Sequence, residues 1–194
     1  MIATDSGTVL IFDFFGVVCS EIAPFWLAER VPYDEALRIK ATLIHEADCG
    51  SISQDEMFRR LGDLVGSPAS LVEQEWWDLV RIDTDVVELI VELRKHHRVG
   101  LLTNSPAEFV RAIIRRFDLT RLFDVIVVSS EIGAIKPSPE PFMEILSRLS
   151  STAQTSLFID DNPANVAASE AVGMLAIRYQ SIAQLRSDLA SVLG

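Results

Sequence analysis

Hydrophobic residues gather in five short runs along the chain, at 8–12, 99–102, 125–128, 156–159 and 174–177. Each run is rich in β-branched and other apolar residues and does not alternate with polar positions. Strands buried on both faces of a parallel sheet have this pattern, whereas a strand with one face in water alternates. The five runs therefore predict a parallel β-sheet, and the run at 174–177 is the weakest of them.

A second pattern, with apolar residues three and four positions apart, lies between these runs. It occurs around 86–93, 110–117 and 142–149 and predicts amphipathic helices. Ser-Pro or Asn-Pro pairs mark several helix starts, and Ser105 is expected to cap the second of these helices through a capping box. Strand and helix alternate from residue 84 onward, so the sequence predicts an α/β fold with a doubly wound parallel sheet.

The segment at 19–83 differs, because it contains helical patterns and no strand-like run. One helix is expected over about 33–47, and a later one is capped by Ser53. A helical segment placed between the first strand and the rest of the sheet is expected to form a small inserted bundle. The predicted domains are therefore an α/β core, made of 1–18 and 84–194, and a helical cap made of 19–83.

Composition narrows the class of protein. Of the 194 residues, 49% are hydrophobic, which excludes a disordered chain, and the net charge of −11 without a Lys/Arg cluster argues against a nucleic-acid partner. The start of the chain lacks the basic segment of a signal peptide, and no stretch reaches the roughly 20 apolar residues that span a bilayer. Two cysteines, Cys19 and Cys49, make no disulfide framework and have no assigned role. We expect a cytoplasmic protein without a membrane partner, as a monomer or a homodimer.

Polar side chains follow three of the predicted strands. Asp13 follows the first run, Thr103 and Asn104 follow the second, and Asp160 and Asp161 follow the run at 156–159. Ligands of open parallel sheets bind beyond the carboxyl ends of the strands. These three strand ends are therefore expected to meet in one crevice.

Carboxylates that meet in one crevice repel one another and raise one another's pKa. They stay ionised together when they share a cation, and oxygen ligands that leave room for waters and a phosphate suit Mg²⁺. Lys136, in the loop after the run at 125–128, adds a positive charge. An Asp side chain can form an aspartyl-phosphate, and a hydroxyl such as that of Thr103 can bind the transferred oxygens. The pattern thus predicts a site for magnesium and phosphate.

Four segments resemble, in order, the four motifs of the haloacid dehalogenase superfamily. They are FDFFGVV at 12–18, LLTN at 101–104, GAIKPSPEPF at 133–142 and FIDDNPANV at 158–166. One such motif alone is a weak signal, whereas four in this order and on the expected elements are a strong one. The resemblance covers essentially the whole chain. It implies a Rossmann-like core and a helical cap that closes over the site and sets substrate choice.

The resemblance also implies a nucleophile and a metal site. Asp13 corresponds to the nucleophile. Mg²⁺ would be held by Asp13, by the backbone carbonyl of Phe15, and by the acidic pair Asp160 and Asp161. Of this pair, Asp161 is favoured over Asp160 as the residue that coordinates the ion directly.

The phosphoryl group has its own implied contacts. Lys136 would bridge this group and Asp13, and Thr103 would donate a hydrogen bond to it. Asn104 is predicted to bind substrate, although a role in the turn is as well supported. The implied function is a magnesium-dependent hydrolase that removes phosphate from a small, sugar-phosphate-like metabolite through an aspartyl-phosphate on Asp13.

Phe15 departs from the family's pattern. Phosphatases of the superfamily usually carry at this position a second Asp, which protonates the leaving group and then activates water. General acid–base catalysis contributes about 10²–10⁴-fold, so its loss slows hydrolysis, most for poor leaving groups, and the Phe15 ring is expected to be a wall of the site. Two alternatives stay open: a 2-haloacid dehalogenase-like hydrolase, and a catalytically weak phosphate-binding or regulatory protein. The presence of both Asp160 and Asp161 favours the magnesium and phosphate interpretation.

Overall fold

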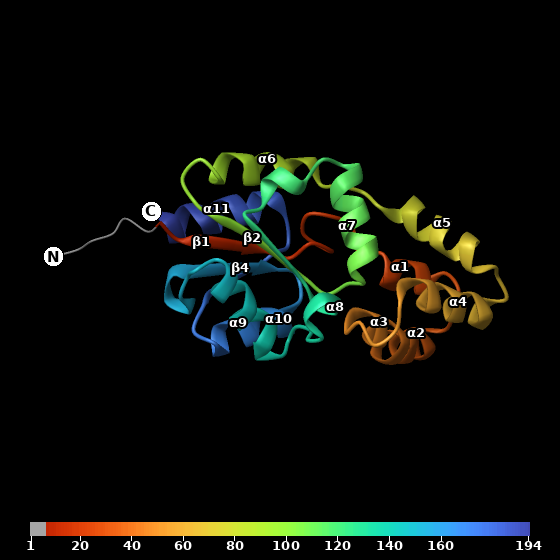
Figure 1. Ribbon diagram of the computed structural model, residues 1–194. Coiled ribbons are helices and arrows are strands. Elements are labelled where there is room, and N and C mark those ends of the chain that lie inside the picture. The colour runs from red at the N-terminus through yellow and green to blue at the C-terminus, as the bar shows by residue number, and fades with distance from the viewer. Residues whose placement is uncertain (1–6) are drawn as a thin grey trace.

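The computed structural model describes residues 7–194 and shows a five-stranded parallel sheet in the order β3-β2-β1-β4-β5 (Figure 1). The strands are β1 (Val9–Phe12), β2 (Val99–Thr103), β3 (Val125–Val128), β4 (Ser156–Asp160) and β5 (Leu175–Arg178). The predicted strands and the α/β fold class are confirmed. The first six residues of the predicted core segment 1–18 lie outside the described residues.

Helices cover both faces of the sheet, as the non-alternating strands predict. On one face lie α6 (Thr84–Leu93), α7 (Ala107–Arg116) and α11 (Ile182–Leu193), and on the other lie α9 (Pro139–Arg148) and α10 (Pro163–Ala171) (Figure 1). Successive side chains of β1 pack alternately on the two faces of the sheet. Leu10 and Phe12 join the cluster that holds the apolar residues of α6, α7 and α11, whereas Val9 and Ile11 join the cluster of α9. This two-residue period is that of a strand buried on both sides.

Strand order reverses beside β1. The chain runs from β1 outward through β2 to β3 and then returns to place β4 on the other side of β1. Such a reversal leaves a crevice beyond the carboxyl ends of the two central strands, and ligands of open α/β sheets bind there. β1 ends next to Asp13 and β4 ends at Asp160, so the fold brings both residues to this crevice.

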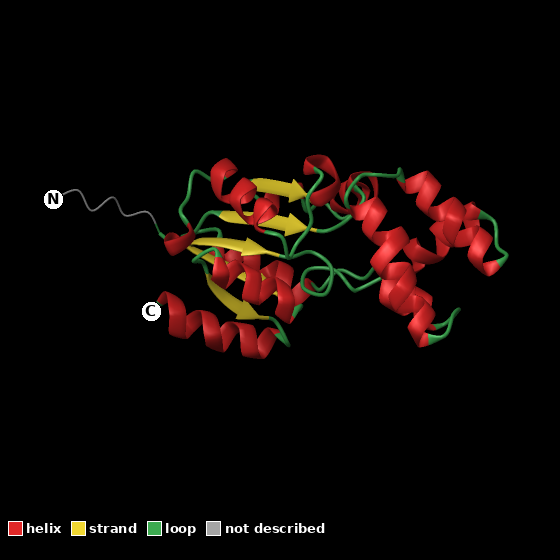
Figure 2. Ribbon diagram, turned by 90° about the horizontal axis from the view of Figure 1, so that it is seen from below, coloured by secondary structure: helices red, strands yellow, loops and turns green. Residues whose placement is uncertain are grey.

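A group of helices lies beyond the carboxyl ends of the strands (Figure 2). They are α1 (Ala23–Ala28), α2 (Tyr33–Ile39), α3 (His45–Asp48), α4 (Gln54–Val65) and α5 (Ala69–Leu79). The helix expected over 33–47 is interrupted by a π-helical turn, η1 (Lys40–Ile44), between α2 and α3. Ser53 caps α4 as predicted, because its hydroxyl accepts the Glu56 N–H. All these helices fall within 19–83, the segment predicted as a cap.

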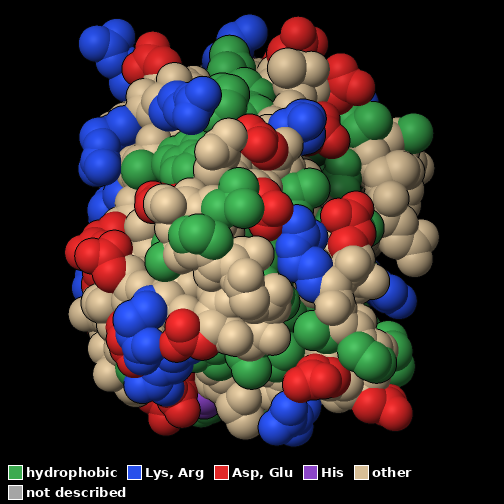
Figure 3. All heavy atoms as spheres, turned by 90° about the vertical axis from the view of Figure 1, so that its right-hand side faces the viewer, with side chains coloured by type: hydrophobic (Ala, Val, Ile, Leu, Met, Phe, Trp, Pro, Cys, Tyr) green, Lys and Arg blue, Asp and Glu red, His purple; other side chains and the backbone are tan. Residues whose placement is uncertain are grey.

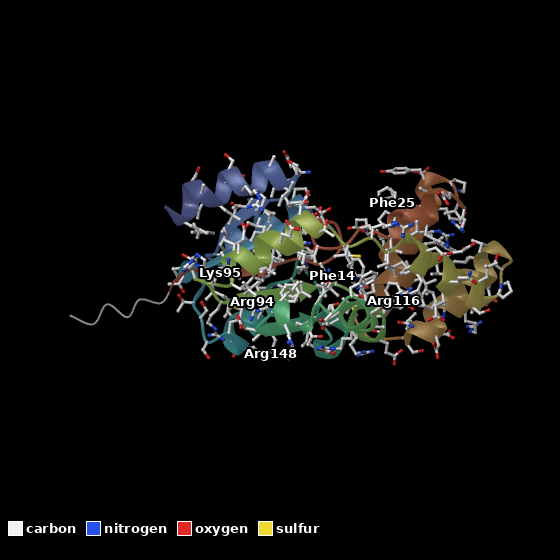
Figure 4. The ribbon with its side chains drawn as sticks, turned by 90° about the horizontal axis from the view of Figure 1, so that it is seen from above. Phe14, Phe25, Arg94, Lys95, Arg116 and Arg148 are labelled. Carbon is white, nitrogen blue, oxygen red and sulfur yellow. The ribbon has the colours of Figure 1, made fainter. Side chains whose placement is uncertain are left out.

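Aromatic side chains join this helical group to the core. Phe109 of α7 packs against Trp76 and Trp77 of α5, at ring-centroid distances of 5.8 and 5.2 Å. The Arg116 guanidinium lies 5.1 Å from the Trp77 ring centroid, and Figure 4 shows Arg116 near the junction between core and helical group. Phe14, which is fully buried, is labelled at the same junction. The helical group therefore rests on an apolar base.

One predicted helix cap is wrong. The Ser105 hydroxyl donates to the Pro106 carbonyl, so it does not cap α7. The first N–H of α7, that of Ala107, instead bonds the Ser130 hydroxyl at 2.8 Å. Ser130 belongs to α8 (Ser129–Ile132), a short helix that directly follows β3. A tertiary contact thus replaces the local capping box, and the local sequence gives no sign of it.

Both signs of charge are mixed on the surface of the helical group (Figure 3). Arg59 and Arg60 both pair with Glu56, and Arg60 also pairs with Glu46. These pairs leave little of that positive charge for a polyanion.

Between residues 7 and 194 no helix is both long enough and apolar enough to cross a bilayer. Two 3₁₀ turns, η2 (Thr120–Leu122) and η3 (Ala153–Thr155), complete the fold.

Candidate active site

Asp13 lies at the centre of the crevice, immediately after β1. Its backbone N–H bonds the Ile159 carbonyl at 2.9 Å, which ties the end of β1 to β4. Its carboxylate oxygen Oδ1 accepts the Phe14 N–H at 2.7 Å and lies 2.8 Å from Lys136 Nζ. The residue is 7% exposed. The Asp13 carboxylate is therefore held rigidly, with one face left toward the crevice.

Lys136 is buried between two carboxylates. Its ammonium lies 2.8 Å from Asp13 and 2.7 Å from Asp160, and it also donates to the Leu102 carbonyl at 3.0 Å. The Asn104 side chain fixes this loop, because its amide nitrogen donates to the Lys136 carbonyl and its oxygen accepts the Lys136 N–H, both at 2.9 Å. Asn104 thus positions Lys136, and its predicted contact with substrate stays a prediction.

Asp160 is enclosed by donors. Its Oδ1 accepts the Asn162 N–H at 2.8 Å, and both of its oxygens accept from Asn165 Nδ2, at 3.1 and 3.0 Å. With Lys136 on Oδ2, few lone pairs stay free. Sequence reasoning assigned no role to Asn165. Asn165 comes one helical turn after the Asn162 cap, so its side chain points back toward the end of the strand. This spacing is the sequence signal that could have identified Asn165.

Asp161 faces the crevice beside the first motif. One ligand oxygen each from Asp13, Asp160 and Asp161 can be chosen so that all lie within 4.8 Å of one another. Gly16 makes room for the Asp161 carboxylate, since a Cβ at Gly16 would lie 2.6 Å from it. No described side chain donates a hydrogen bond to the Asp161 carboxylate, which only its own backbone N–H faces, and no described N–H donates to the Phe15 carbonyl. The Asp161 carboxylate and the Phe15 carbonyl are therefore hard oxygen ligands that, together with Asp13, fit Mg²⁺.

The charges of the site are unbalanced without a cation. Burial, and then the neighbouring Asp160, raise the pKa of Asp13 well above its ordinary value, although Lys136 opposes them. Burial and Asp160 likewise raise the pKa of Asp161. Burial acts on Asp160 in the same direction, but Lys136 and the surrounding donors hold the pKa of Asp160 below its ordinary value. One ammonium is thus shared by two of the three carboxylates, and a divalent ion would supply the positive charge that is still missing.

Thr103 ends β2 with an orphaned hydroxyl. The residue is 1% exposed, and its Oγ1 has no hydrogen-bond partner among the described residues. Buried hydroxyls are nearly always paired, so an unpaired one at the carboxyl end of a strand calls for an explanation. A ligand oxygen at this site would supply the missing partner.

A cavity of about 140 Å³ extends from these groups into the helical segment. Asp13, Asp161 and Lys136 are among the residues that line it. Polar and apolar side chains share its walls about equally, and the larger apolar ones are Phe15, Ile22, Pro24, Ile44, Met57, Trp76 and Phe109. The Phe15 ring stacks on Phe109 at a centroid distance of 6.5 Å. Phe15 is therefore a wall of the cavity, as predicted for a side chain without an ionisable group. Three charged side chains that sequence reasoning did not place here also line the cavity: Glu21, Lys40 and Asp48.

The cysteines take no part in this cavity. Cys19 is buried, and burial raises the pKa of its thiol to about 11, so the thiol is protonated at neutral pH. Cys49 Sγ lies 3.5 Å from His45 Nε2 on α3. Neither side chain lines the cavity described above.

The site defines a class of α/β hydrolase. Its features are an aspartate after the first strand, a buried lysine, and an acidic pair after a neighbouring strand of a Rossmann-like sheet. The sequence profile of the haloacid dehalogenase-like hydrolases matches residues 45–178. This chain belongs to that family.

Similar proteins of known activity are phosphatases. The chain is 28% identical to the sesquiterpene phosphatase astK of Aspergillus oryzae, over 75% of its own length and 76% of the relative's. It is 28% identical to D-ribitol-5-phosphate phosphatase of Bacteroides thetaiotaomicron, over 78% of each chain. The match to phosphoglycolate phosphatase of Salmonella paratyphi A, at 33% identity, covers 39% of this chain and 30% of that protein.

Solved structures share the whole fold. A haloacid dehalogenase family enzyme of Bacteroides thetaiotaomicron, solved with magnesium and inorganic phosphate, gives a TM-score of 0.76 at 19% identity, over 92% of this chain and 98% of that one. A 2-haloacid dehalogenase of Pseudomonas syringae gives a TM-score of 0.63 at 21% identity, over 96% and 99%. At these identities the likeness concerns the fold alone.

Proposed function

We propose that this protein is a magnesium-dependent phosphatase that transfers the phosphoryl group of a small phosphate ester to Asp13 and then to water. The observation that carries the proposal is the convergence of Asp13, Asp160 and Asp161 within 4.8 Å, with Lys136 buried between two of them. The phosphatase relatives support it. Residues 19–83 would then form the cap over this site.

In the proposed reaction, Asp13 attacks phosphorus and the ester oxygen leaves. Asp13, the Phe15 carbonyl and Asp161 would hold Mg²⁺, which would neutralise charge on the phosphoryl oxygens and keep the carboxylates ionised. Lys136 adds a fixed positive charge, and the Thr103 hydroxyl donates to a phosphoryl oxygen. The donors around Asp160 favour a supporting role for it, in which it holds Lys136 in place, with Asp161 as the ligand of the pair.

The substrate is proposed to be small. A cavity of about 140 Å³ lies below the roughly 300–1,000 Å³ of sites for drug-sized ligands. Apolar and aromatic side chains line about half of it, and Glu21, Lys40 and Asp48 are among the polar side chains that line the rest. A compact phosphorylated metabolite, such as a sugar phosphate, fits these limits.

The test is phosphate release from a panel of phosphorylated metabolites, with Mg²⁺ and again with chelator. The proposal predicts turnover of at least one ester, loss of that turnover on chelation, and recovery when Mg²⁺ is restored. Asp13→Asn removes the nucleophile but keeps its shape, so it should be inactive while still folded. If the folded wild-type protein releases no phosphate from any ester in the presence of Mg²⁺, the proposal is refuted.

One observation favours a second function, that of a 2-haloacid dehalogenase. Position 15 carries an aromatic side chain, and a solved dehalogenase shares the fold. Halide release from a chlorinated carboxylate distinguishes the two activities, since it would persist in chelator. The phosphatase proposal predicts no such release.

A further inference from the structure

The phosphatase chemistry proposed above needs a proton for the departing ester oxygen, and Phe15 cannot supply it. The cavity offers another acid, contributed by the helical group. Asp48, at the end of α3, lines the same cavity as Asp13. Among the described residues, no side chain pairs with the Asp48 carboxylate in a salt bridge or hydrogen bond, although the residue is partly buried. A carboxyl group so placed is open to a ligand.

The π-helical turn explains how Asp48 comes to face the cavity. The His45 N–H bonds the Lys40 carbonyl five residues back, which adds one residue to that turn. Asp48 comes eight residues after Lys40. Because of the extra residue, the rotation about the helix axis between them is that of seven α-helical residues, about 700°, which is close to two full turns. Lys40, Ile44 and Asp48 therefore share one face, and all three line the cavity. In an uninterrupted α-helix, Asp48 would lie about 80° from Lys40.

Ser129 anchors this end of α3 to the core. Its hydroxyl donates to the Asp48 carbonyl at 2.6 Å and accepts the Ser105 N–H at 2.9 Å. Gly50 packs closely beside it, because a Cβ there would lie 2.5 Å from the Ser130 carbonyl. Figure 1 shows α3 next to α8, just beyond the end of β3. Asp48 is thus fixed to the loop that follows Thr103, rather than placed by a mobile helix end.

The charges around Asp48 suit an acid that works near neutral pH. Burial raises the pKa of Asp48 to about 7, and Glu21 acts in the same direction, while Lys40 and Lys136 oppose it. On the neighbouring α8, Glu131 is occupied by Arg111. Asp48 can therefore give up and regain a proton in the neutral range.

From this arrangement we propose that Asp48 is the general acid and base of the reaction, in place of the carboxyl group missing at position 15. When Asp13 attacks phosphorus, the P–O bond to the alcohol breaks, and its electron pair takes the proton of the Asp48 carboxyl. In the second step the Asp48 carboxylate takes a proton from water. That water oxygen bonds phosphorus, and the electron pair of the broken P–O bond returns to Asp13.

Glu21 is the competing candidate, and its surroundings argue against it. Burial, and after it the charges of Asp161 and Asp160, raise the pKa of Glu21, so this carboxyl interacts with the metal-binding pair. A cation bound there would hold Glu21 ionised, which is the wrong form for a proton donor. Neither Asp160 nor Asp161 acts on Asp48 in this way. Glu21→Gln therefore serves as the comparison variant.

The experiment compares two esters of similar shape, para-nitrophenyl phosphate and benzyl phosphate. Nitrophenolate leaves without a proton, whereas benzyl alcohol needs one. Asp48→Asn should lower kcat on benzyl phosphate by about 10²-fold or more and change kcat on para-nitrophenyl phosphate much less. The wild type should lose activity on benzyl phosphate as pH rises through about 7, because the acid becomes deprotonated, and Asp48→Asn should lack this decline.

Two further variants make the test specific. Asp34→Asn changes an exposed acid on α2 and should behave as wild type. Phe15→Asp, added to Asp48→Asn, returns a carboxyl group to the other side of the leaving group and should recover about 10-fold or more of the rate on benzyl phosphate.

The outcomes separate this inference from the proposed function. If the wild type hydrolyses neither ester, the phosphatase proposal itself fails. If it hydrolyses both and Asp48→Asn slows them equally, or if Glu21→Gln alone shows the dependence on the leaving group, then Asp48 is not the acid.

Discussion

Gly16 lies against Asp161 so closely that a single added carbon would reach the carboxylate. The backbone of Gly16 has φ +84°, and a Cβ would lie 2.6 Å from the Asp161 carboxylate carbon. The loop of the first motif and the acidic pair of the fourth are therefore fitted to each other. Their separation is set by the absence of a side chain at position 16.

Gly16→Ala should damage the metal site specifically. Displacement of Asp161 should weaken Mg²⁺ binding by about 10-fold or more, and left-handed strain should lower the free energy of unfolding by about 1–3 kcal/mol. Gly66→Ala is the matched control, because Gly66 has φ +70° with nothing within 4 Å of its Cβ. Calorimetry and denaturant unfolding measure both effects. Equal Mg²⁺ affinity in the two variants would contradict the fitted arrangement.

Lys136 is predicted to stabilise the apo-protein. Lys136→Met leaves Asp13 and Asp160 buried without their shared ammonium, and breaking a buried ion pair from one side costs about 3–5 kcal/mol. Urea unfolding in chelator should show a loss of this size. Lys95→Met, at an exposed lysine, should change stability by no more than about 0.5 kcal/mol. A loss below about 1 kcal/mol in Lys136→Met would show that the ammonium is not needed to balance the site.

Thr103→Val should separate stability from activity. The variant removes a buried hydroxyl that has no partner, so the free energy of unfolding should stay the same or rise by about 1 kcal/mol. If that hydroxyl donates to a charged phosphoryl oxygen, worth about 1.5–3 kcal/mol, kcat/KM should fall by about 10–100-fold. Inorganic phosphate with Mg²⁺ should raise the Tm of the wild type more than that of the variant. Full activity in Thr103→Val would remove this residue from the site.

The sheet could be predicted closely from the sequence. Each of the five apolar runs became a strand, with ends shifted by one residue at most, because strands buried on both faces leave a continuous apolar signal. The meeting of Asp13 with Asp160 and Asp161 followed from the parallel order alone, since the carboxyl ends of neighbouring strands lie at one edge. Periodicity and topology determined this part of the site.

Other features depend on contacts between distant segments. The π-helical turn that directs Asp48 into the cavity leaves the apolar pattern over 33–47 looking like an ordinary helix. The hydroxyls of Ser129 and Ser130 bond N–H groups more than twenty residues away, so they replaced a capping box that the local sequence favoured. Local propensity carries no information about these partners.

The central claim is that Asp13 and Asp161 share a magnesium ion beside the ion pair of Asp160 and Lys136, and calorimetric titration of the folded protein with Mg²⁺ tests it most directly. We predict uptake of one ion per chain by the wild type, and loss of that uptake in Asp161→Asn, because no described side chain pairs with the Asp161 carboxylate and it lies within 4.8 Å of Asp13. A wild-type protein that takes up no Mg²⁺, or an Asp161→Asn variant that binds it as tightly, would contradict the account.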